Sequence, residues 1–184
     1  MSLARVAASD ENTAGAVRAG ERVFLSAGNA VEPDGTVRGL GDAASQTHAA
    51  LDRLERALDA AGGSLGNVTK LTTCVVDRGH RTAVYAAIAE RLKGVHPVST
   101  GLVVAGLPRP ELIVQIDAEA AIPSAPARRV RPYTFDSWHG QGFAWQGAMV
   151  VATDDELFVR GQTGSRLDHS GTAGLGRTCD TYRR

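Results

Sequence analysis

Residues 112–120 read LIVQIDAEA, and this stretch decides the fold because nearly every second position is apolar while the positions between turn polar. Gln115, Asp117 and Glu119 share one side of the pattern. A period of two is typical of a β-strand with one face in a core and the other face outside it. We predict a strand over residues 111–121. Its apolar face would carry Leu112, Val114, Ile116, Ala118 and Ala120.

The segments upstream predict the other strands of the same sheet. Val17 and residues 23–25 flank a tight turn at Gly20-Glu21, which is typical of a hairpin. Residues 68–76 are rich in threonine and valine and predict a third strand. Residues 99–106 predict a fourth strand, and the apolar run over residues 102–107 favours a buried position for it.

Two amphipathic helices are predicted between these strands. The first covers residues 43–61 behind a capping Asp42, with Leu51, Leu54, Leu58 and Ala61 on one stripe. The second covers residues 81–93, with Val84, Ala87, Ile88 and Leu92 on one face. The order strand, strand, helix, strand, helix, strand, strand predicts an α+β sheet with both helices on its apolar face. The second face, of mixed polarity, must then meet solvent or other subunits.

Composition excludes several classes of protein. Lysine plus arginine equals aspartate plus glutamate, 20 against 20, so a general nucleic-acid binder or ribonuclease is disfavoured. Two cysteines, Cys74 and Cys179, are too few for a disulfide framework or a structural zinc site. From the mixed charges of the first 20 residues and the short apolar runs, we expect no leader segment and no membrane-spanning stretch. The expectation is a cytoplasmic protein without metal, cofactor or membrane partner.

The last 60 residues differ in composition, since six of the nine aromatic residues lie between residues 133 and 158. Residues 156–162 echo residues 22–29 at an offset of about 133, which indicates an internal repeat. We predict a first domain over residues 1–124, followed by residues 125–184 as an incomplete second repeat of strands and loops or an irregular extension. The sequence ends before a counterpart of the first helix, so the tail is interpreted as a truncated or frame-shifted remnant of a tandem protein.

Over roughly residues 14–122 the chain resembles the Rid family (RidA/YjgF, also called L-PSP endoribonuclease-like). The resemblance rests on the order and spacing of several segments: residues 23–29, 46–62, 67–72, Pro97, residues 104–108 and residues 116–120. It implies a chorismate-mutase-like α+β fold and a homotrimer with ligand clefts between subunits. It also implies hydrolysis of reactive enamines and imines released by pyridoxal-phosphate enzymes.

The family's site residues are replaced at several positions. The resemblance implies an arginine two residues after the strand-opening proline to clamp the substrate carboxylate, but Ser99 stands there. It implies a glutamate on the last strand to position water, where this chain has Gln115. The pocket cysteine, a helix asparagine and a serine before the loop glycine correspond to Gly101, Tyr85 and Ala27.

The leading hypothesis is a Rid-like protein that binds a small, less anionic metabolite between subunits and lacks typical deaminase activity. The residues expected to line its cleft are Ser26, Ala27, Gly28, Tyr85, Ser99, Gly101 and Gln115. Two alternatives stay open. One is an active deaminase with a divergent site, in which Gln115 or Asp117 would be the catalytic candidate. The other is a non-catalytic oligomeric interaction module, whose signature would be clefts blocked by the C-terminal segment.

Two residues on the third predicted strand have both a functional and a structural interpretation. Lys70 would be an anion-binding group at the cleft or a rim lysine, and we favour the rim. Cys74 would be a reactive thiol or a small buried hydrophobic residue, and the valine- and threonine-rich surroundings favour the second.

Overall fold

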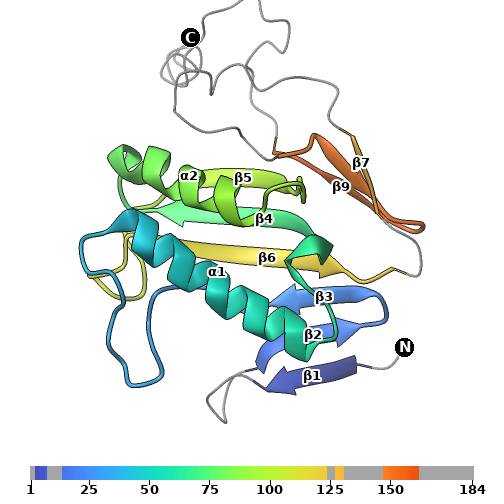
Figure 1. The fold of residues 1–184 in the computed structure, drawn as a ribbon, viewed down its shortest axis with the longest axis horizontal. Coiled ribbons are helices and arrows are strands. Elements are labelled where there is room, and N and C mark those ends of the chain that lie inside the picture. The colour runs from blue at the N-terminus through green and yellow to red at the C-terminus, as the bar shows by residue number, and fades with distance from the viewer. Residues whose placement is uncertain (1–2, 8–13, 124–126, 131–146, 162–184) are drawn as a thin grey trace, which may run out of the picture.

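The computed structural model describes residues 3–7, 14–123, 127–130 and 147–161, and its main feature is a six-stranded sheet (Figure 1). The strand order is β1-β2-β3-β6-β4-β5. Neighbours are antiparallel except β4 and β5, which run parallel. The strands are β1 (Leu3–Ala7), β2 (Ala14–Ala19), β3 (Arg22–Leu25), β4 (Val68–Val75), β5 (Val98–Val103) and β6 (Val114–Ala121).

Two helices, α1 (Ala43–Ala60) and α2 (Arg81–Arg91), cover one face of the sheet (Figure 1). The Asp42 side chain accepts hydrogen bonds from the backbone N–H groups of Ala44 and Ser45, which caps α1. Gly62 follows α1 with a positive φ of 81°. Short 3-10 turns precede β4 (Leu65–Asn67) and α2 (Arg78–His80). In the described part of the chain, neither helix is long and apolar enough to cross a membrane.

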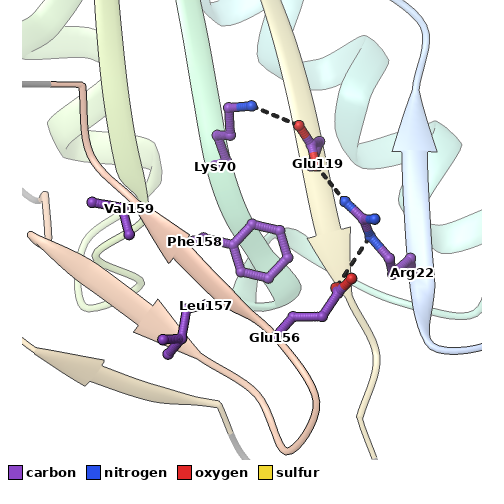
Figure 2. A pocket seen from close by; sticks show the side chains of 7 residues that line it. All are labelled: Arg22, Lys70, Glu119, Glu156, Leu157, Phe158 and Val159. Carbon is purple, nitrogen blue, oxygen red and sulfur yellow. Dashed lines mark hydrogen bonds and ion pairs between the residues drawn. The ribbon is translucent and has the colours of Figure 1, made fainter.

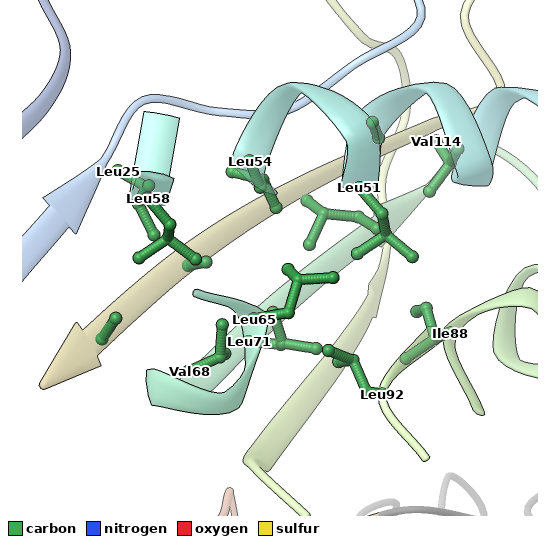
Figure 3. Packing of buried hydrophobic residues seen from close by; sticks show 14 of the residues in the cluster. Leu25, Leu51, Leu54, Leu58, Leu65, Val68, Leu71, Ile88, Leu92 and Val114 are labelled. Carbon is green, nitrogen blue, oxygen red and sulfur yellow. The ribbon is translucent and has the colours of Figure 1, made fainter. Parts of the chain in front are cut away.

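The hydrophobic core lies between the helices and the sheet. Leu51, Leu54 and Leu58 of α1 point onto the sheet, as Figure 3 shows, and all three are buried. Ile88 and Leu92 bring α2 into the same cluster. Each such side chain stabilises the fold by about 1.5–3 kcal/mol when it is fully removed from water.

The structure confirms the predicted α+β architecture with both helices on one face, and the helix bounds differ by at most two residues. Strand β1 was missed, because no signal was assigned to residues 3–7. The buried position predicted for residues 102–107 was wrong, since Leu102 and Val103 are 46% and 48% exposed. The reason is that β5 is an edge strand and ends at Val103.

A second, three-stranded sheet packs against the first. It has the order β7-β8-β9, with both pairs antiparallel. Its strands are β7 (Arg128–Val130), β8 (Val150–Ala152) and β9 (Leu157–Val159). Figure 1 shows it in orange beside one end of the main sheet. The proposed end of the second repeat, residues 162–184, lies outside the described residues.

An ion-pair network joins the two helices on their outer side. Arg91 of α2 contacts Asp52 at 2.5 Å and Glu55 at 2.6 Å, and Arg38 contacts Asp52 at 2.6 Å. Partial burial raises the pKa of Asp52, but hydrogen bonds and charge from Arg91 and Arg38 outweigh it, so the pKa lies below 3.8. Because the folded-state pKa is lowered, this stabilisation is present above the unfolded value and is lost as pH falls through the folded value.

We expect Asp52→Asn to lower the free energy of unfolding by about 1 kcal/mol at neutral pH, the range for a partly exposed network. The difference from wild type should shrink below pH 3.8, where the native carboxyl also becomes protonated. Urea denaturation across pH measures this. Asp59→Asn, at an exposed position of the same helix, is the control. A difference that stays constant down to acid pH would contradict the role of the ionised carboxylate.

Candidate functional site

The predicted site residues fall into groups on different sides of the sheet. Tyr85, Ser99 and Gly101 lie where α2 packs on β5. Ser99 is paired with the core residue Leu71, so its side chain faces the helices, and it is only 7% exposed. A Cβ built on Gly101 would lie 1.9 Å from the Tyr85 hydroxyl oxygen. The Tyr85 hydroxyl therefore occupies the space that any side chain at position 101 would need.

Two arginines add positive charge around Tyr85. Burial raises the pKa of Tyr85, against the opposing effects of Arg81, of the Arg160 charge and of a hydrogen bond with Ser99. The Arg81 guanidinium carbon lies 5.7 Å from the centre of the Tyr85 ring. Desolvation lowers the pKa of Arg160, with Tyr85 opposing it. Neither arginine was predicted from the sequence. Arg160 lies 75 positions along the chain from Tyr85, and no local motif marks it.

Gln115 and Asp117 lie on the face of the sheet that the helices do not cover, here called the open face. Gln115 pairs across the strands with Cys74, and Asp117 pairs with Thr72. Desolvation raises the pKa of Asp117. Desolvation and the charge of Asp117 raise the pKa of Cys74, so its thiol is less reactive than a free cysteine. This disfavours the reactive thiol, but the buried position predicted for Cys74 was wrong, because the residue is only partly buried on the open face.

Residues Ser26, Ala27 and Gly28 follow β3 and lead into the loop before α1. Gly28 exchanges backbone hydrogen bonds with Ile116, at 2.8 and 2.9 Å. A Cβ on Gly28 would lie 2.5 Å from the Ala50 carbonyl oxygen and 2.9 Å from Leu54 Cγ. Close packing against α1 therefore accounts for this glycine without a ligand. Ser26 is exposed and Ala27 is partly buried.

Within the described residues of one chain, the sheet separates the Ser99 group from the Gln115 group. Ser99 faces α2, whereas Gln115 is on the open face and two strands away in the order β6-β4-β5. A single cleft containing both groups therefore requires a second copy of one group from another repeat or chain.

The structure also contains an open pocket of about 430 Å³. This pocket was not predicted from the sequence. It lies between the open face and β9, and Figure 2 shows Phe158 projecting from β9 toward the strands that carry Lys70, Glu119 and Arg22. The lining residues are Arg22, Lys70, Glu119, Glu156, Leu157, Phe158 and Val159.

The charges of this pocket neutralise one another. Glu119 contacts Lys70 at 2.8 Å and Arg22 at 2.9 Å, and Arg22 also contacts Glu156 at 3.2 Å. Desolvation raises the pKa of Glu119, but Lys70 and Arg22 outweigh it and the pKa is lowered. Lys70 is thus an ion-paired residue on an inner strand and does not lie at the edge of the sheet. Among the described residues, no group of three or more histidine, cysteine, aspartate or glutamate side chains is placed to hold a metal ion.

Comparison with known proteins places this fold in a family. The model of the protein family described as Endoribonuclease L-PSP matches residues 3–122 of this chain. The chain belongs to this family. The resemblance to the Rid proteins that the sequence indicated is therefore confirmed.

Three solved structures illustrate the L-PSP family fold. A YjgF/YER057c/UK114 family member from Mycobacterium tuberculosis is 28% identical, with a TM-score of 0.58, and the match covers 66% of this chain and 100% of that one. A putative endoribonuclease from Thermotoga maritima is 25% identical, with a TM-score of 0.58 and coverage of 63% and 91%. RidA from an Antarctic Psychrobacter is 23% identical, with a TM-score of 0.57 and coverage of 62% and 92%.

We expect Gly28→Ala to destabilise this L-PSP family chain by about 1–3 kcal/mol, because the added methyl group would overlap the Ala50 carbonyl. Urea denaturation measures the change. Gly106→Ala is the matched control, since a Cβ there meets nothing within 4 Å. Equal stability of the two variants would contradict a packing role for Gly28.

We expect one of the three tyrosines to ionise above the ordinary pKa of 10.0, and Tyr85→Phe to remove that late titration. The raised folded-state pKa also means that stability falls as pH rises past 10.0, and that the variant loses less there. Ultraviolet absorbance titration tests the assignment. Tyr133→Phe serves as the control. A late titration that survives Tyr85→Phe would show that another phenol is responsible.

Proposed function

We propose that this L-PSP family protein binds a small polar metabolite in a cleft between subunits of a homotrimer and lacks typical enamine or imine deaminase activity. The observation that carries the proposal is the position of Tyr85. Its hydroxyl fills the space next to Gly101 and reaches Ser99, which is itself buried. The volume in which the resemblance implies an arginine and a cysteine thus holds a tyrosine ring.

The replaced side chains also lack the required chemistry. An arginine–carboxylate fork contributes charge-assisted hydrogen bonds of about 1.5–3 kcal/mol each, and the Ser99 hydroxyl is a neutral group that cannot form such a fork. Gln115 can hold a water molecule but cannot accept its proton, so it provides no general base. Arg81 and Arg160 approach Tyr85 instead, so the ligand need not be as neutral as the sequence predicted.

A second candidate function is a non-catalytic interaction module. The observation that favours it is the packing of β8 and β9 against the main sheet. Ala148, Val151 and Phe158 form a buried cluster with Val98 of β5. A segment in this position covers part of the surface through which clefts between subunits would form.

We expect no acceleration of 2-aminoacrylate hydrolysis by the purified protein above the rate in buffer. The reason is that neither Ser99 nor Gln115 supplies the charge or the base that this reaction needs. Rapid mixing of the protein with freshly generated 2-aminoacrylate measures the rate. Robust turnover that Gln115→Ala or Asp117→Ala abolishes would contradict the proposal and favour the divergent deaminase.

A further inference from the structure

The strands β7, β8 and β9, here called the second meander, repeat the arrangement of β1, β2 and β3. Both sets have the same strand order with antiparallel pairs. Val17 pairs with Phe24 in the first set, and Val151 pairs with Phe158 in the second. The two pairs are related by one offset of 134 positions, since 151 minus 17 and 158 minus 24 are equal. This register match supports the internal repeat that the sequence indicated.

Arg160 directly follows β9 and lies where the second meander meets β5. At the same offset it is the equivalent of Ser26, which was expected from the sequence to line the cleft. Its backbone N–H donates to the Met149 carbonyl at 3.0 Å, and its Nη1 lies 3.8 Å from Met149 Sδ. A Cβ on the next residue, Gly161, would lie 2.7 Å from Thr100 Oγ1. The chain at Arg160 therefore packs directly on β5.

Two guanidinium groups act on the Tyr85 side chain from different elements. Arg81 is the first residue of α2, and its guanidinium carbon lies 5.7 Å from the centre of the Tyr85 ring. Burial raises the pKa of Tyr85, and the positive charges of Arg81 and Arg160 oppose this effect. Desolvation also lowers the pKa of Arg160, because a cation is less stable away from water. An anion at this place would therefore stabilise the charged form of Arg160.

A buried hydroxyl group lies beside these charges. Thr73 is 0% exposed, and within the described part of the chain its Oγ1 has no hydrogen-bond partner. Thr73 pairs with Gly101 across β4 and β5, so its side chain stands next to the space that the Tyr85 hydroxyl fills. Buried polar groups nearly always have a partner. A ligand oxygen at this point would provide one for Thr73.

Solvent reaches this group of side chains at Gly101. Tyr85 and Ser99 are only 4% and 7% exposed, whereas Gly101 between them and the solvent is exposed. Because Gly101 has no side chain, the Tyr85 hydroxyl lies directly over an exposed stretch of β5. A small group of a ligand can therefore approach the hydroxyl from this side.

We infer that Arg160 makes the second meander part of the ligand site: with Arg81, it binds an oxyanion of the ligand, a carboxylate or a phosphate, next to the Tyr85 and Thr73 hydroxyls. Guanidinium groups bind such groups through paired, charge-assisted hydrogen bonds. The inference rests on the proposed function, because Tyr85 belongs to one wall of the cleft proposed there between subunits. It adds the charge of the ligand and a residue outside residues 3–122, which the family model matches.

Ligand binding and the docking of the second meander are then linked. Arg160 contacts the ligand only while the second meander lies on β5, so a bound anion favours this arrangement. The linkage is reciprocal, because a ligand that prefers one state is also bound more tightly by that state. Anion binding is therefore expected to slow hydrogen exchange over residues 147–161.

The test measures binding of propionate and of inorganic phosphate to the full-length protein by calorimetry, at constant ionic strength. Propionamide is the neutral isostere of propionate and should not bind. Arg160→Gln should weaken anion binding by about tenfold or more, as expected for the loss of a hydrogen bond between charged groups. Arg78→Gln is the matched control, because Arg78 is an exposed arginine three residues before Arg81; it should leave the affinity unchanged.

A second variant separates a ligand contact from a structural role. Thr73→Val keeps the shape of the side chain and removes only its hydroxyl. It should weaken anion binding without lowering stability in urea, because the hydroxyl has no partner within the described part of the chain that would be lost.

Binding of either anion supports the inference, and comparing propionate with phosphate tells which oxyanion the ligand carries. The inference is overturned if neither anion binds, if propionamide binds as tightly as propionate, or if Arg160→Gln or Thr73→Val binds as tightly as wild type. If Arg160→Gln releases the second meander, seen as faster hydrogen exchange over residues 147–161 without anion, Arg81→Gln decides in its place. Light scattering and the 2-aminoacrylate assay test the trimer and the missing deaminase activity separately, so failure of the proposed function would be seen apart from failure of anion binding.

Discussion

The structure depends on burying the apolar face of β6 under α1. Strand β6 pairs with both β3 and β4, so its alternation sets which face of the whole sheet is apolar. The leucines of α1 repeat every three or four residues and match that face, which gives the packing seen in Figure 3. A shift of one residue in β6 would turn Ile116 outward and Asp117 into the core.

The same alternation leaves an open face that carries polar and charged side chains. Charged side chains project from it on three strands and form the network of Arg22, Lys70 and Glu119. Partly buried ion pairs add little to stability but disfavour wrong neighbours. The open face is therefore suited to select one docked segment, and Glu156 provides the complementary charge.

The periodicity of apolar residues predicted most helices and strands, but it could not predict contacts between segments that are far apart in the chain. The stripe of Leu51, Leu54 and Leu58 and the cap at Asp42 gave α1 nearly to the residue. The buried position predicted for residues 102–107 was wrong, because an apolar run does not indicate whether its strand lies at the edge of a sheet. The contact between Tyr85 and Gly101, and the approach of Arg160 to Tyr85, join distant segments without a shared motif.

The meanders β1-β2-β3 and β7-β8-β9 have equivalent residues at matching positions, but the neighbouring elements decide which of these residues are buried. Val23 is buried under α1, whereas its equivalent Leu157 is largely exposed, and the phenylalanines next to them are exposed and buried in the reverse order. A strand can bury apolar side chains only on the face that packs against another element. For β1-β2-β3 the partner is helix α1, and for β7-β8-β9 it is the main sheet. The second meander therefore buries its apolar side chains by packing on the main sheet, next to Val98 of β5.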